Sequence, residues 1–285
     1  MKENIIDRRF GMKRFRLVGL LSALFLLIAV FAQAADINLW HHSTLYQIQK
    51  RGVLRVGLNA GYMPFEMRSK TGKIIGFDVD LAKLMAKAMG VKLQIVNTDW
   101  DGIIPSLMTG KFDIIMSGMT ITQKRNMKVN FADPYAIVGQ TILLNKKWAG
   151  KVKSYKDLNS PKFTITVMLG TTGDFAAKKF MPKAKIQEFQ TEEEAVMQVI
   201  QGRADAFVYD KPYNSIFYAT KGKGKLVFLD KPFTYEPLGW AINKGDPDFL
   251  NWLNNFLRQI KHDGEYQKLY NKWFVNVKDW INKVQ

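Results

Sequence analysis

The sequence contains no cysteine among its 285 residues. This absence excludes disulfide bonds, a thiol nucleophile, a thiolate metal site and the acylated cysteine that anchors a lipoprotein. Histidine is also scarce, with His41 and His42 adjacent near the expected mature start and His262 between two predicted C-terminal helices. Three histidines spread in this way do not suggest a metal site, and we expect neither a metal nor another cofactor.

Long apolar runs are absent after the N-terminal segment. There, basic residues precede an apolar run at 17–31, and Ala32-Gln33-Ala34 supplies a small-x-small cleavage pattern. The run is about 15 residues, shorter than the roughly 20 that span a bilayer. We therefore predict a cleaved signal peptide at 1–34, rather than an uncleaved anchor, and a periplasmic mature protein; Met12 remains an alternative start.

Acidic residues are outnumbered, and the formal net charge is +17. Such a balance raises the question of nucleic acid or an anionic membrane. The lysines are scattered over different predicted elements, however, and no arginine-rich stripe is present. We expect no nucleic-acid partner and interpret the charge as a contribution to solubility and to mild steering of anions.

Strand and helix patterns alternate along the chain in two sets. The first set has predicted strands at 53–58, 91–96 and 112–116 with helices at 76–89 and 102–108 between them. The second set has strands at 163–168, 186–189 and 204–209 and helices at 174–180 and 191–201, followed by strand 239–242 and C-terminal helices. This alternation predicts an α/β protein with parallel strands, and two such sets suggest two lobes with a ligand crevice at the strand ends.

The loop after strand 112–116 has the residue types that hold a carboxylate. Gly118 allows close backbone approach, Thr120 offers a hydroxyl, and Arg125 follows Thr122, a predicted helix N-cap. Arginine presents a planar pair of donors to an anion such as a ligand carboxylate. An ordinary strand-to-helix turn would have the same pattern.

Three other loops carry possible ligand contacts. The segment 169–173 is a glycine-rich turn before a helix, whose free N–H groups could face an anion. Asp210 closes a strand, where it could receive an ammonium group or cap the next helix. Tyr62 and Trp100 follow strands and could sandwich a side chain or cover the core.

Taken in order, these segments resemble the polar-amino-acid branch of the bacterial extracellular solute-binding proteins, family 3, which serve ATP-driven (ABC) importers. The resemblance covers nearly the whole mature chain. It is carried by Gly61-Tyr62-Met63-Pro64-Phe65-Glu66, Gly76-Phe77-Asp78, Trp100-Asp101-Gly102, Gly110-Lys111-Phe112-Asp113, Thr120-Ile121-Thr122 with Arg125, Arg203-Ala204-Asp205-Ala206 with Asp210, and Tyr270-Asn271-Lys272-Trp273-Phe274.

The resemblance implies a type II periplasmic-binding-protein-like fold, in which two lobes are joined by two crossing strands. By matching position, lobe 1 comprises residues 35–137 plus 236–285, and lobe 2 comprises residues 138–235. The crossings fall near 135–139 and 234–238. The implied function is capture of a free amino acid by a monomer that closes around it and delivers it to a membrane permease.

The resemblance also assigns roles within the site. Arg125 and Thr120, with backbone at Gly118 and Thr172, correspond to the family's clamp on the ligand carboxylate. Asp210 corresponds to the acceptor of the ligand ammonium. Both are needed because each buried charge of a zwitterion costs several kcal/mol without a partner.

The side-chain end of the predicted pocket departs from the family pattern. Tyr62 and Trp100 correspond to its aromatic walls, but Asn59 stands where relatives that prefer cationic side chains carry an acid. Met168 stands where glutamine binders place a polar or basic residue. These differences predict a neutral ligand, with glutamine favoured.

An enzymatic function is the alternative, since cyclohexadienyl or arogenate dehydratases resemble this family in fold. Dehydration needs a carboxylic acid near the leaving hydroxyl. Glu236 lies on the second predicted crossing and could approach the crevice, but an acid there is ordinary for a binding protein. We therefore expect a binding protein rather than an enzyme.

Overall fold

The computed structural model describes residues 39–284, so the predicted signal peptide at 1–34 lies outside the described residues. The chain divides into two units, Met1–His42 and Ser43–Gln285. In the first unit, α2 (Leu39–His42) is one short helix; all that follows concerns the second unit. Among residues 39–284, no helix is both long enough and apolar enough to cross a membrane.

The first lobe contains a five-stranded sheet in the order β4, β1, β5, β14, β6. β1 is parallel to β4 and to β5, as the alternating pattern predicts. The returning strand β14 is antiparallel to β5 and β6, so the sheet is mixed. The strands are β1 (Val53–Leu58), β4 (Lys92–Asn97), β5 (Ile114–Ile115), β6 (Asn130–Phe131) and β14 (Ala241–Ile242).

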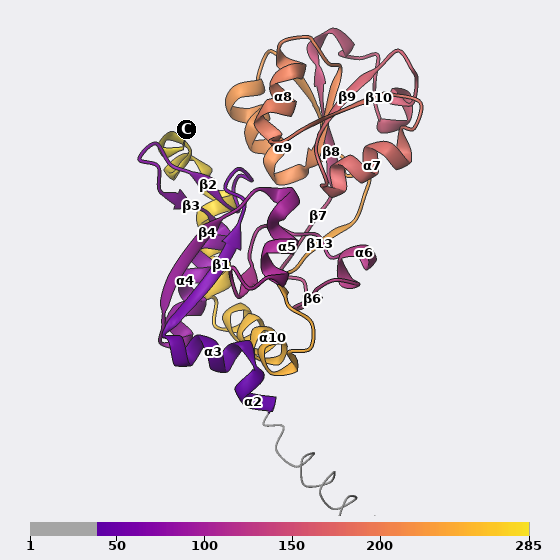
Figure 1. Ribbon diagram of the computed structural model, residues 1–285. Helices are drawn as coiled ribbons and strands as arrows, with labels where there is room; N and C mark the ends of the chain where they lie inside the picture. The colour runs from indigo at the N-terminus through magenta and orange to yellow at the C-terminus, as the bar shows by residue number, and fades with distance from the viewer. Residues whose placement is uncertain (1–38, 285) are drawn as a thin grey trace, which may run out of the picture. The chain divides into compact units, whose positions relative to one another are not determined.

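Helices pack on this sheet, and Figure 1 shows α4 beside β1 and β4. The long C-terminal helix α10 buries one apolar face, formed by Phe249, Leu253, Phe256, Leu257 and Ile260. A hairpin of β2 (Met67–Arg68) and β3 (Ile74–Ile75) adds to this lobe. The helices are α3 (Thr44–Arg51), α4 (Phe77–Met89), α5 (Ile103–Met108), α6 (Gln123–Asn126), α10 (Pro247–His262) and α11 (Glu265–Tyr270).

The second lobe contains another five-stranded sheet, in the order β10, β9, β11, β8, β12. β9 is parallel to β10 and β11, whereas β8 is antiparallel to β11 and β12. A capping box begins α8, because the Thr191 hydroxyl accepts from the Glu194 N–H while the Glu194 carboxylate accepts from the Thr191 N–H. The elements are β8 (Gln140–Asn145), β9 (Thr164–Met168), α7 (Thr172–Phe180), β10 (Lys185–Phe189), α8 (Glu192–Ile200), β11 (Ala206–Asp210), α9 (Lys211–Phe217) and β12 (Leu226–Leu229).

Two crossing strands join the lobes. β7 (Ala136–Val138) and β13 (Glu236–Leu238) pair antiparallel, with Glu236 opposite Val138. Their backbones approach closely beside Gly139, where a Cβ atom would lie 2.5 Å from the Thr234 carbonyl oxygen. The mixed α/β architecture with two lobes and two crossing strands is the fold that the family resemblance implies.

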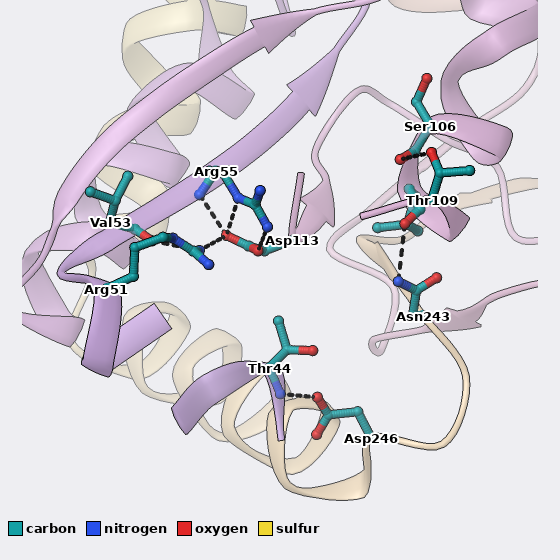
Figure 2. A network of polar contacts seen from close by, with 10 residues as sticks. Thr44, Arg51, Val53, Arg55, Ser106, Thr109, Asp113, Asn243 and Asp246 are labelled. Carbon is teal, nitrogen blue, oxygen red and sulfur yellow. Dashed lines mark hydrogen bonds and ion pairs between the residues drawn. The ribbon is translucent and has the colours of Figure 1, made fainter. Parts of the chain in front are cut away.

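Buried acids anchor the first lobe away from the crossings (Figure 2). The Asp113 carboxylate lies between two guanidinium groups, 2.5 Å from Arg51 and 2.7 Å from Arg55. Asp246 caps α10 by accepting from the Phe249 N–H, and it also accepts from the Ser43 hydroxyl at 3.0 Å. These contacts fix the start of α3, β1 and the start of α10 relative to one another.

Candidate functional site

Seven of the nine predicted site residues line one small cavity between the two lobes. They come from the loops and helix starts at the carboxyl ends of strands, where an α/β sheet places its ligands. The first lobe contributes Tyr62, Trp100, Gly118, Thr120 and Arg125, and the second contributes Gln140, Thr171, Thr172, Tyr209 and Asp210.

Arg125 is held in this cavity by carbonyl groups and an aromatic ring. The Thr122 hydroxyl caps α6 by accepting from the Arg125 N–H, which confirms the predicted N-cap. The guanidinium donates to the carbonyls of Thr120 at 2.9 Å and Gly170 at 3.4 Å, and lies 5.2 Å from the Trp100 ring centroid. Burial lowers the pKa of Arg125 to about 10, so the group remains charged at neutral pH.

Asp210 faces the same cavity from the second lobe. It occupies the N-cap position of α9, yet its side chain makes no capping hydrogen bond. Instead its carboxylate accepts from the Tyr62 hydroxyl at 2.6 Å and from the Gln140 amide at 2.5 Å. Burial raises the pKa of Asp210 to about 7, although the hydrogen bond from Tyr62 opposes this shift.

The predicted glycine-rich turn also reaches the cavity. Thr171 is the N-cap of α7, and its hydroxyl accepts from the Asp174 N–H. Thr172 is the first helical residue, and its hydroxyl lies 3.3 Å from that of Thr120 across the cavity. The Trp100 indole donates to the Gly170 carbonyl at 3.2 Å, so two hydrogen bonds from the first lobe end on this carbonyl.

The backbone at Gly118 is positioned by two buried acids beneath it. Gly118 has φ +50°, and a Cβ atom there would lie 2.3 Å from the Tyr62 ring. Its N–H donates to Asp78 at 2.9 Å, and the neighbouring Ser117 hydroxyl donates to Glu66 at 2.7 Å. Burial raises the pKa of Asp78 to about 7 and that of Glu66 well above its ordinary value.

The remaining two predicted residues lie elsewhere. Asn59 lines a second cavity on the other side of the Tyr62 loop, together with Gly61, Glu192 and Tyr213. Met168 lines neither cavity, because its side chain is buried with its sulfur 3.8 Å from the Tyr209 hydroxyl. The end of β9 turns this side chain into the core of the second lobe.

Sequence reasoning did not identify Gln140, although it is one of the two polar contacts of Asp210. Its amide donates to Asp210 and, at 3.2 Å, to the Thr172 hydroxyl. A signal was available, since Gln140 directly follows Gly139 of the predicted crossing and precedes the apolar run Ile142-Leu143-Leu144. Its strand β8 was not predicted either.

The cavity therefore places a cation and a carboxylate on opposite walls. Within residues 39–284, no ion pair joins Arg125 to Asp210, and the side-chain hydrogen bonds of both residues are made with neutral groups. Such an arrangement complements a small molecule that carries both charges. Among the same residues, no cluster of three or more His, Cys, Asp or Glu side chains could hold a metal ion.

Comparison with known proteins agrees with this fold. Residues 54–276 match the model of the bacterial extracellular solute-binding proteins, family 3. A probable histidine-binding protein of Neisseria gonorrhoeae is 36% identical over 226 residues, which cover 78% of this chain and 83% of the relative. The chain belongs to this family of solute-binding proteins.

Two solved structures are more similar in sequence. One is the putative binding component of an ABC transporter from Wolinella succinogenes, whose structure is complexed with lysine. It is 59% identical to this chain, with a TM-score of 0.79, and the match covers 82% of this chain and all of the other. The other is the ancestral amino acid-binding protein AncCDT-1, a precursor of cyclohexadienyl dehydratase. It is 56% identical to this chain, with a TM-score of 0.77, and the match covers 81% of this chain and all of the other. This chain is thus a member of the amino acid-binding proteins of ABC transporters.

Proposed function

We propose that this protein captures a free L-α-amino acid by gripping its two main-chain charges. Arg125 and the Thr120 hydroxyl receive the ligand carboxylate, and Asp210 receives the ligand ammonium. The observation that carries this proposal is the placement of Arg125 and Asp210 on opposite walls of one cavity without an ion pair between them. A zwitterion supplies the missing partner to each group.

Capture is proposed to occur by closure of the lobes about the two crossing strands. Lobe 1 comprises residues 35–137 plus 236–285, and lobe 2 comprises residues 138–235. The hydrogen bonds from Tyr62 to Asp210 and from Trp100 to Gly170 join groups of different lobes, which supports a closing motion. After removal of the signal peptide 1–34, the monomeric protein then works in the periplasm and delivers its ligand to the permease of an ABC importer.

Two side-chain classes compete as the cargo. Asn59 favours a neutral side chain such as that of glutamine, because its amide both donates and accepts hydrogen bonds. Met168 gives this reading no further support, since it lies outside both cavities. A basic side chain is favoured by the similar protein of Wolinella succinogenes, whose structure contains lysine.

Catalysis is the second candidate function, suggested by the similarity to a precursor of cyclohexadienyl dehydratase. Glu236 is buried on β13 and close enough to the cavity to raise the pKa values of Arg125 and Asp210. An acid in that place would be a proton donor for a leaving hydroxyl. Incubation with prephenate distinguishes the two functions, and we expect no turnover.

Titration calorimetry of the mature protein with each of the twenty amino acids tests the proposal. Protein purified by denaturation and refolding gives a ligand-free starting sample, and native mass spectrometry of protein purified without refolding reveals any retained cargo. We expect tight binding of a small group of L-amino acids and none of their D-isomers. Failure of every amino acid to bind would overturn the proposed function.

A further inference from the structure

Glu192, the first residue of α8, is a buried acid that the main-chain clamp does not use. Its side chain is 2% exposed, and its Oε1 atom has no hydrogen-bond partner. Burial raises the pKa of this carboxyl to about 7, opposed by the hydrogen bond from its own N–H. A buried carboxylate with an oxygen left unsatisfied costs free energy unless a partner arrives.

This carboxylate points from the second lobe at the loop that follows β1. A Cβ atom at Gly61 would lie 2.4 Å from Glu192 Oε1, so the glycine is what permits the approach. Gly61 precedes Tyr62, whose hydroxyl contacts Asp210 in the main-chain site. The acid therefore lies one residue along the loop from the clamp.

The cavity that Glu192 lines holds about 320 Å³, enough for an amino-acid side chain. An aromatic pair lies between it and the main-chain cavity: Tyr209 lines the first cavity, Tyr213 lines the second, and their rings meet edge to face with centroids 5.2 Å apart. Asn59 lies on the first-lobe wall of the same cavity. The side chain of a ligand held at Arg125 and Asp210 reaches the space between Asn59 and Glu192 if it passes this aromatic pair.

The charges around this cavity leave Glu192 without a cation. Lys221 and the exposed Arg68 line the cavity, but Lys221 is paired with Glu193 at 2.8 Å. Among the described residues, no ion pair joins Glu192 to a lysine or arginine, and the nearby acid Glu66 repels it. A cation brought by the ligand would be its first positive partner.

We infer that Glu192 receives the basic group at the end of the ligand's side chain and so selects basic amino acids such as lysine and arginine. The inference rests on the proposed function, because the clamp fixes where the side chain begins. A neutral side chain would leave the buried acid either unpaired or protonated. Asn59 alone favours glutamine; Glu192 outweighs it because a buried charge gains more from an opposite charge than from an amide.

The test is calorimetric titration of wild type and Glu192→Gln with lysine, arginine and glutamine. We expect wild type to bind a basic amino acid more tightly than glutamine, and the variant to lose about 30-fold or more in affinity for it. Affinity for glutamine should be unchanged or higher. The matched control is Glu193→Gln, which changes the exposed neighbouring acid and should leave all three affinities within about twofold.

A double variant distinguishes loss of the acid from misfolding of the Glu192→Gln protein. In Asn59→Asp combined with Glu192→Gln, the acid moves to the opposite wall of the same cavity, and affinity for basic ligands should recover by about tenfold or more. The inference is overturned if wild type prefers glutamine, if Glu192→Gln binds lysine and arginine like wild type, or if the double variant shows no recovery. Wild type that binds no amino acid at all would instead overturn the proposed function.

Discussion

At the scale of single residues, Arg125 shows how the site prepares for an anion. Its guanidinium donates to two carbonyl groups and faces the Trp100 ring, which orients the charge without neutralising it. A carboxylate partner from the protein would have to be displaced by the ligand. Carbonyl groups hold the side chain in place and leave its charge available.

Replacing Arg125 by lysine should lower ligand affinity by about 30-fold or more, because an ammonium group cannot present two parallel N–H donors. Calorimetry with the preferred amino acid measures the loss. Lys124→Ala is the matched control, since Lys124 is exposed on the same short helix and should be dispensable. Equal losses in both variants would mean that the effect comes from α6 rather than from the guanidinium.

Binding should become tighter as the pH rises from 6 to 8. The pKa of Asp210 is about 7, so its carboxylate is mostly protonated at pH 6 and mostly ionised at pH 8. The ligand ammonium requires the ionised form, which predicts an increase in affinity of about tenfold over this range. Calorimetry with glutamine isolates this effect from Glu192, and a flat profile would contradict it.

The site was partly predictable because some of its residues carry a local signal. Arg125 follows a capping threonine and Asp210 ends a strand before Lys-Pro, so both stand out in loops. Glu192 is the first of three consecutive glutamates, a pattern that normally indicates a solvated first helical turn. Its burial arises from contact with Gly61 of the other lobe, which no local pattern encodes.

At the scale of elements, caps and buried acids set how the strands and loops are held. Asp246 serves two helices at once, since it caps α10 and accepts from the Ser43 hydroxyl at the start of α3. Asp78 joins α4 to the binding loop, because it accepts from both the Gly118 N–H and the Tyr135 hydroxyl. The contribution of each acid to the stability of the protein can therefore be tested separately.

Asp246→Ala should destabilise the protein by about 2 kcal/mol, because the cap is lost and the buried Ser43 hydroxyl loses its acceptor. For a protein of this size, this corresponds to a fall in Tm of about 4–8 °C. Thermal unfolding followed by circular dichroism measures it. Asp248→Ala is the control, since that residue lies in the same first turn and is exposed.

The buried acid pair should make wild type less stable at alkaline pH. The pKa of Asp78 is raised to about 7, so its contribution is fully present below its unfolded pKa and is lost as the pH rises through 7. We expect Tm to fall between about pH 4 and pH 8, and to fall less in Asp78→Asn. An unchanged slope in the variant would contradict the assignment of this acid.

Some elements escaped prediction for reasons of topology. The strands β1, β4 and β5 follow the alternation of strand and helix, and their positions agree with the sequence patterns. β8 and β12 pair antiparallel to each other, and β12 is contributed by residues far along the chain. No helix separates β8 from the crossing strand β7, and β12, although it follows α9, pairs only with the antiparallel β8. The pattern that reveals parallel strands therefore does not reveal them.

At the scale of the whole molecule, ligand binding should change the size of the protein. Closure about β7 and β13 predicts a smaller radius of gyration with the preferred amino acid than without it, measurable by small-angle X-ray scattering. Arg125→Ala should show no change under the same conditions. Identical scattering curves for wild type with and without ligand would contradict closure.

The hydrogen bond between Tyr62 and Asp210 has a consequence for affinity. It joins the two lobes through the same carboxylate that is proposed to receive the ligand ammonium. A ligand whose ammonium takes the place of the Tyr62 hydroxyl competes with this internal donor, and its measured affinity is then the difference between the bonds it forms and the bond it displaces. Two relatives that make identical contacts with the ligand can consequently differ in affinity because their hydrogen bonds at this position differ in strength.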